Sequence, residues 1–199
     1  MPRFTRAELE SHYDETVPDL LPAAAQPLRL LFVGINPGLW TAATQTHFAH
    51  PVNRFYPALY AAGIIPRPID PAAGMTDAER DVLRARGIGI TNLVHRATAR
   101  ASELTSAELR AGRAGLTELV DSRRPAVVAM AGITAYRTAF GLPKAISGRQ
   151  EQRLGGGPGW PGAELWVVPN PSGLNAHETV ATLAAAYADA ARAAGVLAE

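Results

Sequence analysis

The sequence predicts an α/β protein with three layers, in which helices cover both faces of a central, mainly parallel sheet. Short apolar runs alternate with segments of helical periodicity along the chain, and strands separated by helices form parallel sheets. The chain has 199 residues, of which 47% are hydrophobic, enough for one large core. Two of the apolar runs lead directly into Pro/Gly turns, at residues 34–38 and 169–174. Open α/β sheets bind their ligands at the edge where such turns lie.

The order of elements follows from hydrophobic periodicity. Continuous apolar runs predict four strands, at residues 28–33, 89–94, 126–131 and 164–168. Helical spacing and start signals predict helices at residues 5–13, 53–63, 76–85, 106–119, 134–140 and 177–194. In the helix that follows Asn53, the side chains of Phe55, Leu59 and Tyr60 are expected to point inward.

Residues 148–162 contain six glycines and two prolines, with Trp160 among them. This composition predicts a loop, either the end of a hairpin or a mobile surface flap. Residues 1–27 hold Pro18, Pro22 and Pro27 and are expected to form an arm packed on the core, while residues 28–199 form a single domain.

Composition narrows the function classes. Cysteine is absent, which excludes disulfides, thiol nucleophiles and Cys-ligated metals. His47 and His50 lack a third ligand at a suitable spacing, so neither a metal nor another cofactor is expected. No apolar run approaches a membrane span and the start lacks a signal peptide, so we expect a cytoplasmic protein, and a monomer, with no membrane partner.

The net charge is only +1, and every basic residue except Lys144 is an arginine. Arginine suits bidentate contacts to phosphate or guanine, although a compositional bias explains the same usage. A basic set in predicted loops and helix ends is a candidate DNA face, with a solvated surface as the alternative: Arg96, Arg100, Lys144, Arg149 and Arg153.

The first turn carries a specific chemistry. Pro37 fixes its own φ, and Gly34 and Gly38 permit a ligand to approach the backbone closely. Asn36 is then expected at the mouth of the turn with its amide directed outward. The alternative is that Asn36 caps the following turn, because asparagine is a favoured cap residue.

Four segments in order resemble the mismatch-specific uracil- and thymine-DNA glycosylases, a branch of the uracil-DNA glycosylase superfamily. They are residues 34–39 (GINPGL), 48–56 (FAHPVNRFY), 89–94 (GITNLV) and 170–175 (NPSGLN). The resemblance implies a glycosylase-like fold and a monofunctional enzyme of base excision repair. Such an enzyme flips uracil out of mismatched double-stranded DNA, with G·U preferred and thymine or etheno-cytosine as further substrates, and hydrolyses the N-glycosidic bond.

The resemblance also implies roles for individual residues. Asn36 would position the attacking water, and Phe48 would stack on the extruded base. The residues expected around the base are Gly34, Ile35, Phe48, His47 and Asn92. The loop that enters the duplex would comprise Ser172, Gly173, Leu174 and Asn175, with Leu174 as the wedge. Further candidates are Trp40, Thr41, His95 and Arg96.

Physical reasoning agrees with these roles. Extruding a base requires an apolar wedge and an aromatic platform, which are the residue types at Leu174 and Phe48. Backbone amides around residues 35–39 are expected to stabilise the departing base anion. Because Asn36 cannot deprotonate water, we expect a slow enzyme. Two structural roles remain as alternatives to DNA insertion. Leu174 packs onto the terminal helix, and Asn175 with Glu178 forms an ordinary helix cap.

Three positions depart from the family pattern. His95 stands where relatives have an acidic residue, and Ala176 stands where some have an arginine that reads the widowed guanine. Trp40 is larger than its counterpart in some relatives, so it either narrows the pocket or covers it.

Two other functions fit the same scaffold. One is a nucleotide-binding protein or nucleoside hydrolase that acts on free nucleotides. Leu174 argues against it, because such an enzyme has no use for an apolar protrusion, and the chain also lacks a P-loop. The other is a DNA-lesion sensor without strong catalysis, which would keep Phe48 and Leu174 but release no base.

Overall fold

The computed structural model describes residues 4–198 and contains a five-stranded sheet in the order β2-β1-β3-β5-β4. The strands are β1 (Leu30–Gly34), β2 (Ile88–Asn92), β3 (Val127–Ala131), β4 (Gly148–Leu154) and β5 (Ala163–Val168). All neighbours pair in parallel except β4 and β5, which are antiparallel. Every residue of β1, β2 and β3 is buried, as expected for parallel strands covered on both faces.

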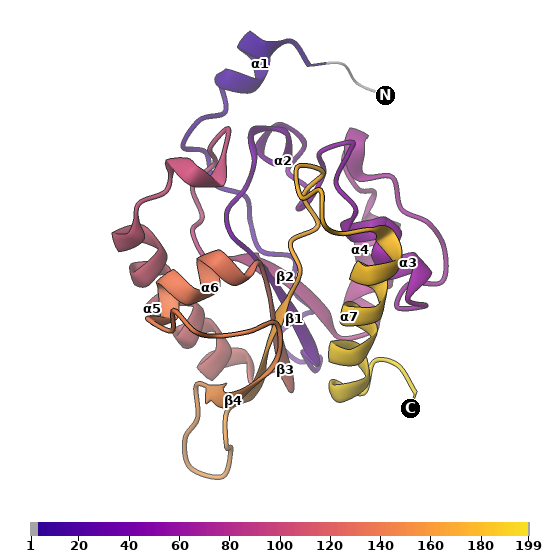
Figure 1. The fold of residues 1–199 in the computed structure, drawn as a ribbon. Coiled ribbons are helices and arrows are strands. Elements are labelled where there is room, and N and C mark those ends of the chain that lie inside the picture. The colour runs from indigo at the N-terminus through magenta and orange to yellow at the C-terminus, as the bar shows by residue number, and fades with distance from the viewer. Residues whose placement is uncertain (1–3, 199) are drawn as a thin grey trace.

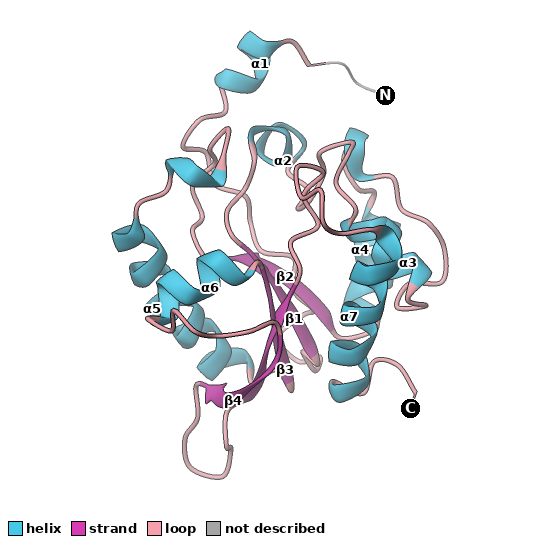
Figure 2. Cartoon of the chain, in the orientation of Figure 1, coloured by secondary structure: helices cyan, strands magenta, loops and turns pink. Residues whose placement is uncertain are grey.

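Helices form a layer on each side of the sheet (Figures 1 and 2). On one face lie α5 (Ser106–Arg123) and α6 (Ile133–Phe140), and on the other lie α3 (Phe55–Ala61), α4 (Asp77–Ala85) and α7 (Val180–Ala193). Two short helices, α1 (Arg6–Glu10) and α2 (Leu39–Thr44), lie beyond the carboxyl edge of the strands. The predicted three-layer α/β/α fold is therefore confirmed.

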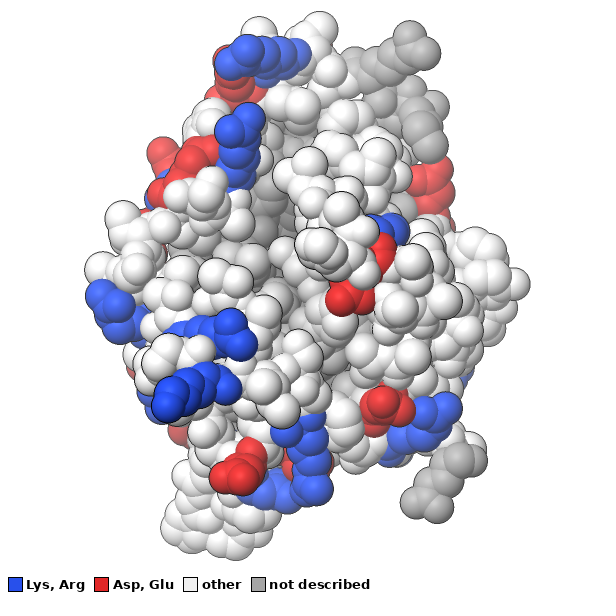
Figure 3. Space-filling model, in the orientation of Figure 1, with Lys and Arg blue, Asp and Glu red and all other residues white. Residues whose placement is uncertain are grey.

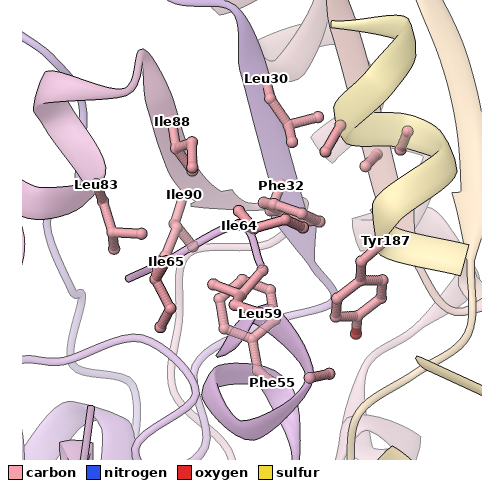
Figure 4. Close-up of a cluster of buried hydrophobic side chains, with 14 of the residues drawn as sticks. Leu30, Phe32, Phe55, Leu59, Ile64, Ile65, Leu83, Ile88, Ile90 and Tyr187 are labelled. Atoms are coloured by element: carbon pink, nitrogen blue, oxygen red, sulfur yellow. The ribbon is translucent and has the colours of Figure 1, made fainter. Parts of the chain in front are cut away.

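Alternate residues of β1 belong to two separate hydrophobic cores, one on each face of the sheet, because successive strand side chains point to opposite faces. Phe32 packs edge-to-face on Phe55 of α3, with ring centroids 5.1 Å apart, and lies 5.3 Å from the ring of Tyr187 of α7. Figure 4 shows this cluster between the sheet and the two helices. Leu31 and Val33 belong to the second core, under α5 and α6. Both cores hold the strand ends in fixed positions.

The prediction for residues 148–162 was partly wrong. Residues 148–154 form strand β4, and only the residues between β4 and β5 form the expected hairpin end. The strand sequence GRQEQRL has no apolar alternation, because β4 is an edge strand whose residues are mostly exposed or half-buried. Pairing with β5 creates this strand, and pairing leaves no local signal.

The inward face of α3 also differs from the prediction. Phe55 and Leu59 are buried as expected, but Tyr60 is 48% exposed and Tyr56 is buried in its place. Five residues of α-helix rotate a side chain by about 140° from its starting direction, which carries Tyr60 away from the side of Phe55. The short helix α2 was not predicted, and α7 begins three residues later than expected, after its cap Thr179.

The N-terminal segment pairs with strand β2 at Leu20. Leu20 exchanges two backbone hydrogen bonds with Ile90 of β2, with N···O distances of 2.9 and 2.7 Å, and both Val17 and Leu20 are buried. Within residues 4–198, no helix has the length and apolar character needed to cross a membrane.

Candidate active site

A cavity of about 280 Å³ opens at the carboxyl edge of the sheet. All four parallel strands contribute to it at or just beyond their last residues, through Gly34 (β1), Asn92 (β2), Ala131 (β3) and Asn170 (β5). The remaining lining residues come from the segments that follow these strands, from α2 and from the loop between α2 and α3: Ile35, Asn36, Gly38, Thr41, Phe48, His50, Val52, Asn53, Thr98, Ala99, Ala101, Ser172, Gly173 and Leu174. The cavity thus lies where open α/β sheets bind ligands.

The turn after β1 and the loop after β5 meet at this cavity, as the sequence predicted. Asn36 and Leu174 both line it. The loop after β5 also packs closely on the loop between α2 and α3, since a Cβ added to Gly173 would lie 2.5 Å from Cγ2 of Val52. In Figure 3 the surface is hollowed beside the projecting loop that follows β5, and the atoms around the hollow are mostly uncharged.

The amide of Asn36 has one defined orientation. Its Nδ2 lies 3.0 Å from the Pro37 carbonyl oxygen, 3.1 Å from that of Arg96 and 2.7 Å from Oγ1 of Thr98. The Thr98 hydroxyl donates its proton to the Arg100 carbonyl oxygen at 2.9 Å, so it accepts from Asn36. Three acceptors therefore surround Nδ2, and the carbonyl oxygen Oδ1 is left for the cavity.

These contacts contradict the capping alternative for Asn36. Helix α2 begins after Gly38, and the Asn36 side chain donates hydrogen bonds instead of accepting one from a helix amide. The oxygen of a fixed amide is a hydrogen-bond acceptor, so it can orient a water molecule but cannot take its proton.

The floor of the cavity combines Gly34, Asn92 and Phe48. A Cβ on Gly34 would lie 2.5 Å from Oδ1 of Asn92 and 3.3 Å from Cζ of Phe48, so only glycine fits between them. Phe48 has a left-handed backbone (φ 57°) and stacks on Phe55 with centroids 4.1 Å apart. The ring of Phe48 is thus held as a flat wall that can receive another planar ring.

His47 lies behind the cavity and does not line it, contrary to the prediction that it binds the base. It is 4% exposed, with Nε2 3.0 Å from the Pro18 carbonyl oxygen and Nδ1 3.2 Å from Nδ2 of Asn92. The left-handed backbone at Phe48 separates the directions of the two neighbouring side chains. Burial lowers the pKa of His47, which keeps the ring neutral.

The loop after β5 presents Leu174 to solvent. Leu174 is 88% exposed, so the alternative that it packs onto the terminal helix is wrong. The loop is braced from within, because Oδ1 of Asn170 accepts from the Ser172 amide at 3.0 Å and Nδ2 of Asn175 donates to the Asn170 carbonyl at 3.1 Å. Asn175 does not cap the terminal helix, because Thr179 does.

Arg54 holds this loop from the start of α3, a role that the sequence did not reveal. Its guanidinium donates to the carbonyl oxygens of Ser172 (2.5 Å), Asn175 (2.7 Å) and Glu178. Its backbone amide donates to the Pro171 carbonyl at 3.0 Å. One side chain therefore joins the segment that carries Phe48 to the loop that carries Leu174.

Of the four further candidates from the sequence, one lines the cavity and three do not. Thr41 lines the cavity, but Trp40, His95 and Arg96 lie outside its lining. Nε1 of Trp40 donates to the Ala72 carbonyl oxygen at 3.0 Å, and Nδ1 of His95 lies 3.9 Å from Oδ1 of Asp19. Arg96 pairs with Glu108 at 2.5 Å and with Asp14 at 3.1 Å, and its hydrogen bond lowers the pKa of Glu108 to about 2.

The predicted basic DNA face is not a single surface at the cavity. Arg149 and Arg153 of β4 pair with Glu164, at 2.9 and 3.2 Å. Arg153 lies opposite the amino end of β5, at the edge of the sheet remote from the cavity. Among the described residues that line the cavity, none is lysine, arginine, aspartate or glutamate, and His50 is the one titratable side chain. Burial lowers the pKa of His50.

Several lining residues carried no sequence signal. His50, Val52 and Asn53 lie within a segment that carries the family resemblance, but the resemblance implied no contact between them and the base, and no sequence pattern pointed to Thr98. Oδ1 of Asn53 accepts from the Phe55 amide at 2.9 Å, just before α3 begins. Only the folded chain brings these residues to the turn after β1.

Two comparisons with known proteins bear on this site. Residues 22–191 match the model of the Uracil DNA glycosylase superfamily. Among solved structures, the chain is similar to a Methanosarcina acetivorans protein studied by solution NMR and provisionally described as a uracil DNA glycosylase. The two share 17% identity and superpose with a TM-score of 0.50, covering 87% of this chain and 98% of the other. At this identity the structural match supports the fold alone.

Proposed function

Because the chain belongs to the uracil-DNA glycosylase superfamily, we propose that it is a monofunctional DNA glycosylase that excises uracil from mismatched duplexes, with G·U preferred. The observation that carries the proposal is the shared cavity of Asn36 and Leu174. One residue offers a fixed acceptor for water, and the other offers an exposed apolar side chain beside it.

Base extrusion is the first step of the proposed reaction. A base within a duplex is inaccessible to a cavity at the protein surface, so it must leave the stack, at a cost of a few kcal/mol that is least at a mismatch. Leu174 fills the space that the base vacates, and Phe48 stacks on the extruded base. The lower cost of extrusion explains a preference for G·U over A·U pairs without an arginine at position 176.

Hydrolysis follows in the cavity. The bond between C1′ of the sugar and N1 of uracil breaks, and its electron pair leaves with the base. Oδ1 of Asn36 accepts a hydrogen bond from the water that adds to C1′, and that water releases its proton to solvent. Asn92 lies beside Gly34 in the cavity lining and supports the departing base by hydrogen bonding.

The lining predicts a slow reaction. Among the cavity residues in the described part of the chain there is no carboxylate to remove the proton from water. The lack of a general base costs about 10² to 10⁴ in rate. Positioning of the water and stabilisation of the base therefore carry the catalysis.

The composition of the lining argues against a free-nucleotide enzyme. The cavity residues described here include no lysine or arginine that would neutralise the phosphates of a free nucleotide. A lesion sensor would need Leu174 and Phe48 but would have no use for an amide held by three acceptors, as Asn36 is.

The test is release of free uracil from duplexes with uracil opposite guanine or adenine, and from single strands. We expect fastest release opposite guanine, and Asn36→Ala to slow single-turnover release at least about 100-fold, because the water loses its orientation. Gln150→Ala, a polar change on β4 outside the cavity, serves as the control.

Each other outcome identifies an alternative. Undiminished release by Asn36→Ala overturns the proposed mechanism. Release from free nucleotides alone favours a nucleoside hydrolase, and tight binding to G·U duplexes without release favours a lesion sensor.

A further inference from the structure

A chain of two hydrogen bonds runs behind the cavity, from the Pro18 carbonyl through His47 to Asn92. We propose that His47 is a positioning residue that locks the side-chain amide of Asn92 in one of its two orientations and thereby makes the cavity select uracil over cytosine. The proposal rests on the proposed function, because it assigns base selectivity to the same cavity.

The protons on this chain are fixed by the carbonyl at its end. A carbonyl oxygen only accepts hydrogen bonds, so Nε2 of His47, 3.0 Å from the Pro18 oxygen, carries the proton. In a neutral ring, Nδ1 then holds a lone pair. The atom of Asn92 that lies 3.2 Å from Nδ1 must be the donor Nδ2, because the amide oxygen there would face a second lone pair.

The surroundings of His47 keep its ring neutral. The side chain is 4% exposed, and burial disfavours the imidazolium form. The hydrogen bond to the Pro18 carbonyl oxygen and the charge of Asp19 raise the pKa of His47, and His95 lowers it together with burial, which has the largest effect.

A locked amide has a fixed hydrogen-bonding pattern. With Nδ2 directed to His47, Oδ1 of Asn92 lies on the Gly34 side of the cavity floor, and the second Nδ2 proton remains for a ligand. Uracil offers the complement, an acceptor at O4 and a donor at N3. Cytosine offers a donor at N4 and an acceptor at N3, which an amide satisfies only after it rotates by 180°.

His47 does not contact the base itself. Both ring nitrogens are engaged and the ring does not line the cavity. Its effect on a base therefore passes through Asn92.

The test compares excision of uracil and cytosine, each placed opposite an abasic-site analogue so that neither base is paired. We expect His47→Leu to lower the ratio of uracil to cytosine release at least about tenfold, because an unpaired Asn92 amide is free to rotate. His47→Gln, whose side-chain oxygen can accept from Asn92, should restore part of the ratio. An unchanged ratio in folded His47→Leu, as judged by circular dichroism, would overturn the proposal.

A second measurement needs no substrate. ¹⁵N NMR of the free wild-type protein between pH 6 and 8 should show His47 protonated at Nε2 alone. Protonation at Nδ1, or at both nitrogens, overturns the lock whatever the enzyme excises. If the wild-type protein releases neither base while His47 shows the expected tautomer, the proposed function fails and the positioning role of His47 stands.

Discussion

The turn after β1 and the loop after β5 contain the same dipeptide, Asn-Pro, and use it in opposite ways. The amide of Asn36 is held by residues about 60 positions away in the sequence, Arg96 and Thr98, and its oxygen is left for the cavity. The amide oxygen of Asn170 is used within its own loop, where it accepts from the Ser172 amide.

The difference shows that the hydrogen-bond partners of each asparagine, and not the Asn-Pro sequence, determine what its side chain does. Distant acceptors turn Asn36 into a fixed acceptor for a ligand. A local hydrogen bond turns Asn170 into a structural brace that exposes Leu174. The turn is rigid and suited to chemistry, while the loop is held at its base by Arg54 and suited to insertion.

The largest expected effect tests the rigidity of the turn. Gly34→Ala places a Cβ 2.5 Å from Oδ1 of Asn92, so the floor of the cavity must shift, and we expect uracil release to fall at least about 100-fold. Gly115→Ala on α5 is the matched control, because its Cβ meets nothing within 4 Å and Gly115 lies outside the cavity lining. Equal single-turnover rates for the two variants would show that close packing at the floor is not needed.

An intermediate effect is expected where the loop is held. Arg54→Met removes the donors to three loop carbonyls while keeping a long apolar side chain, so we expect release from G·U duplexes to fall about tenfold. The exposed Arg67 in the loop after α3 supplies the control Arg67→Met, which removes the same charge. If both variants lose activity equally, the loss comes from net charge and not from the loop.

The smallest effect concerns pH. Burial lowers the pKa of His50 below its ordinary value of 6.5, so the ring is neutral from pH 7 upward and gains its charge only on acidification. We expect the rate of release to change by less than about threefold between pH 7 and 8.5. Any change below pH 6.5 should disappear in His50→Gln. A rate that rises steeply above pH 7 would require a general base that the described lining lacks.

Much of the fold was readable from local sequence. The apolar runs of the parallel strands predicted a sheet covered on both faces, because buried strands need no polar alternation. The order of the strands was not readable, and β4 was missed because its exposed polar residues become a strand only by pairing with β5.

The residues of the candidate site likewise fall into those that the sequence revealed and those that it did not. Residues next to the turns, such as Gly34, Asn36 and Leu174, were identified because each turn carries a local signal. Thr98 and the loop contacts of Arg54 were missed, because these hydrogen bonds join segments far apart in the sequence. His47 was placed in the cavity lining and lies behind it, since the direction of a loop side chain depends on backbone angles that the sequence does not reveal.

The most direct test of the account is the fluorescence of 2-aminopurine placed beside uracil in a G·U duplex, which rises when the neighbouring base leaves the stack. The central claim is that Leu174 extrudes the nucleotide and Asn36 acts on it afterwards. We predict that Asn36→Ala raises the fluorescence as fully as wild type does before cleavage, and that Leu174→Ala raises it little. A full rise with Leu174→Ala, or none with Asn36→Ala, would contradict this division between the two regions.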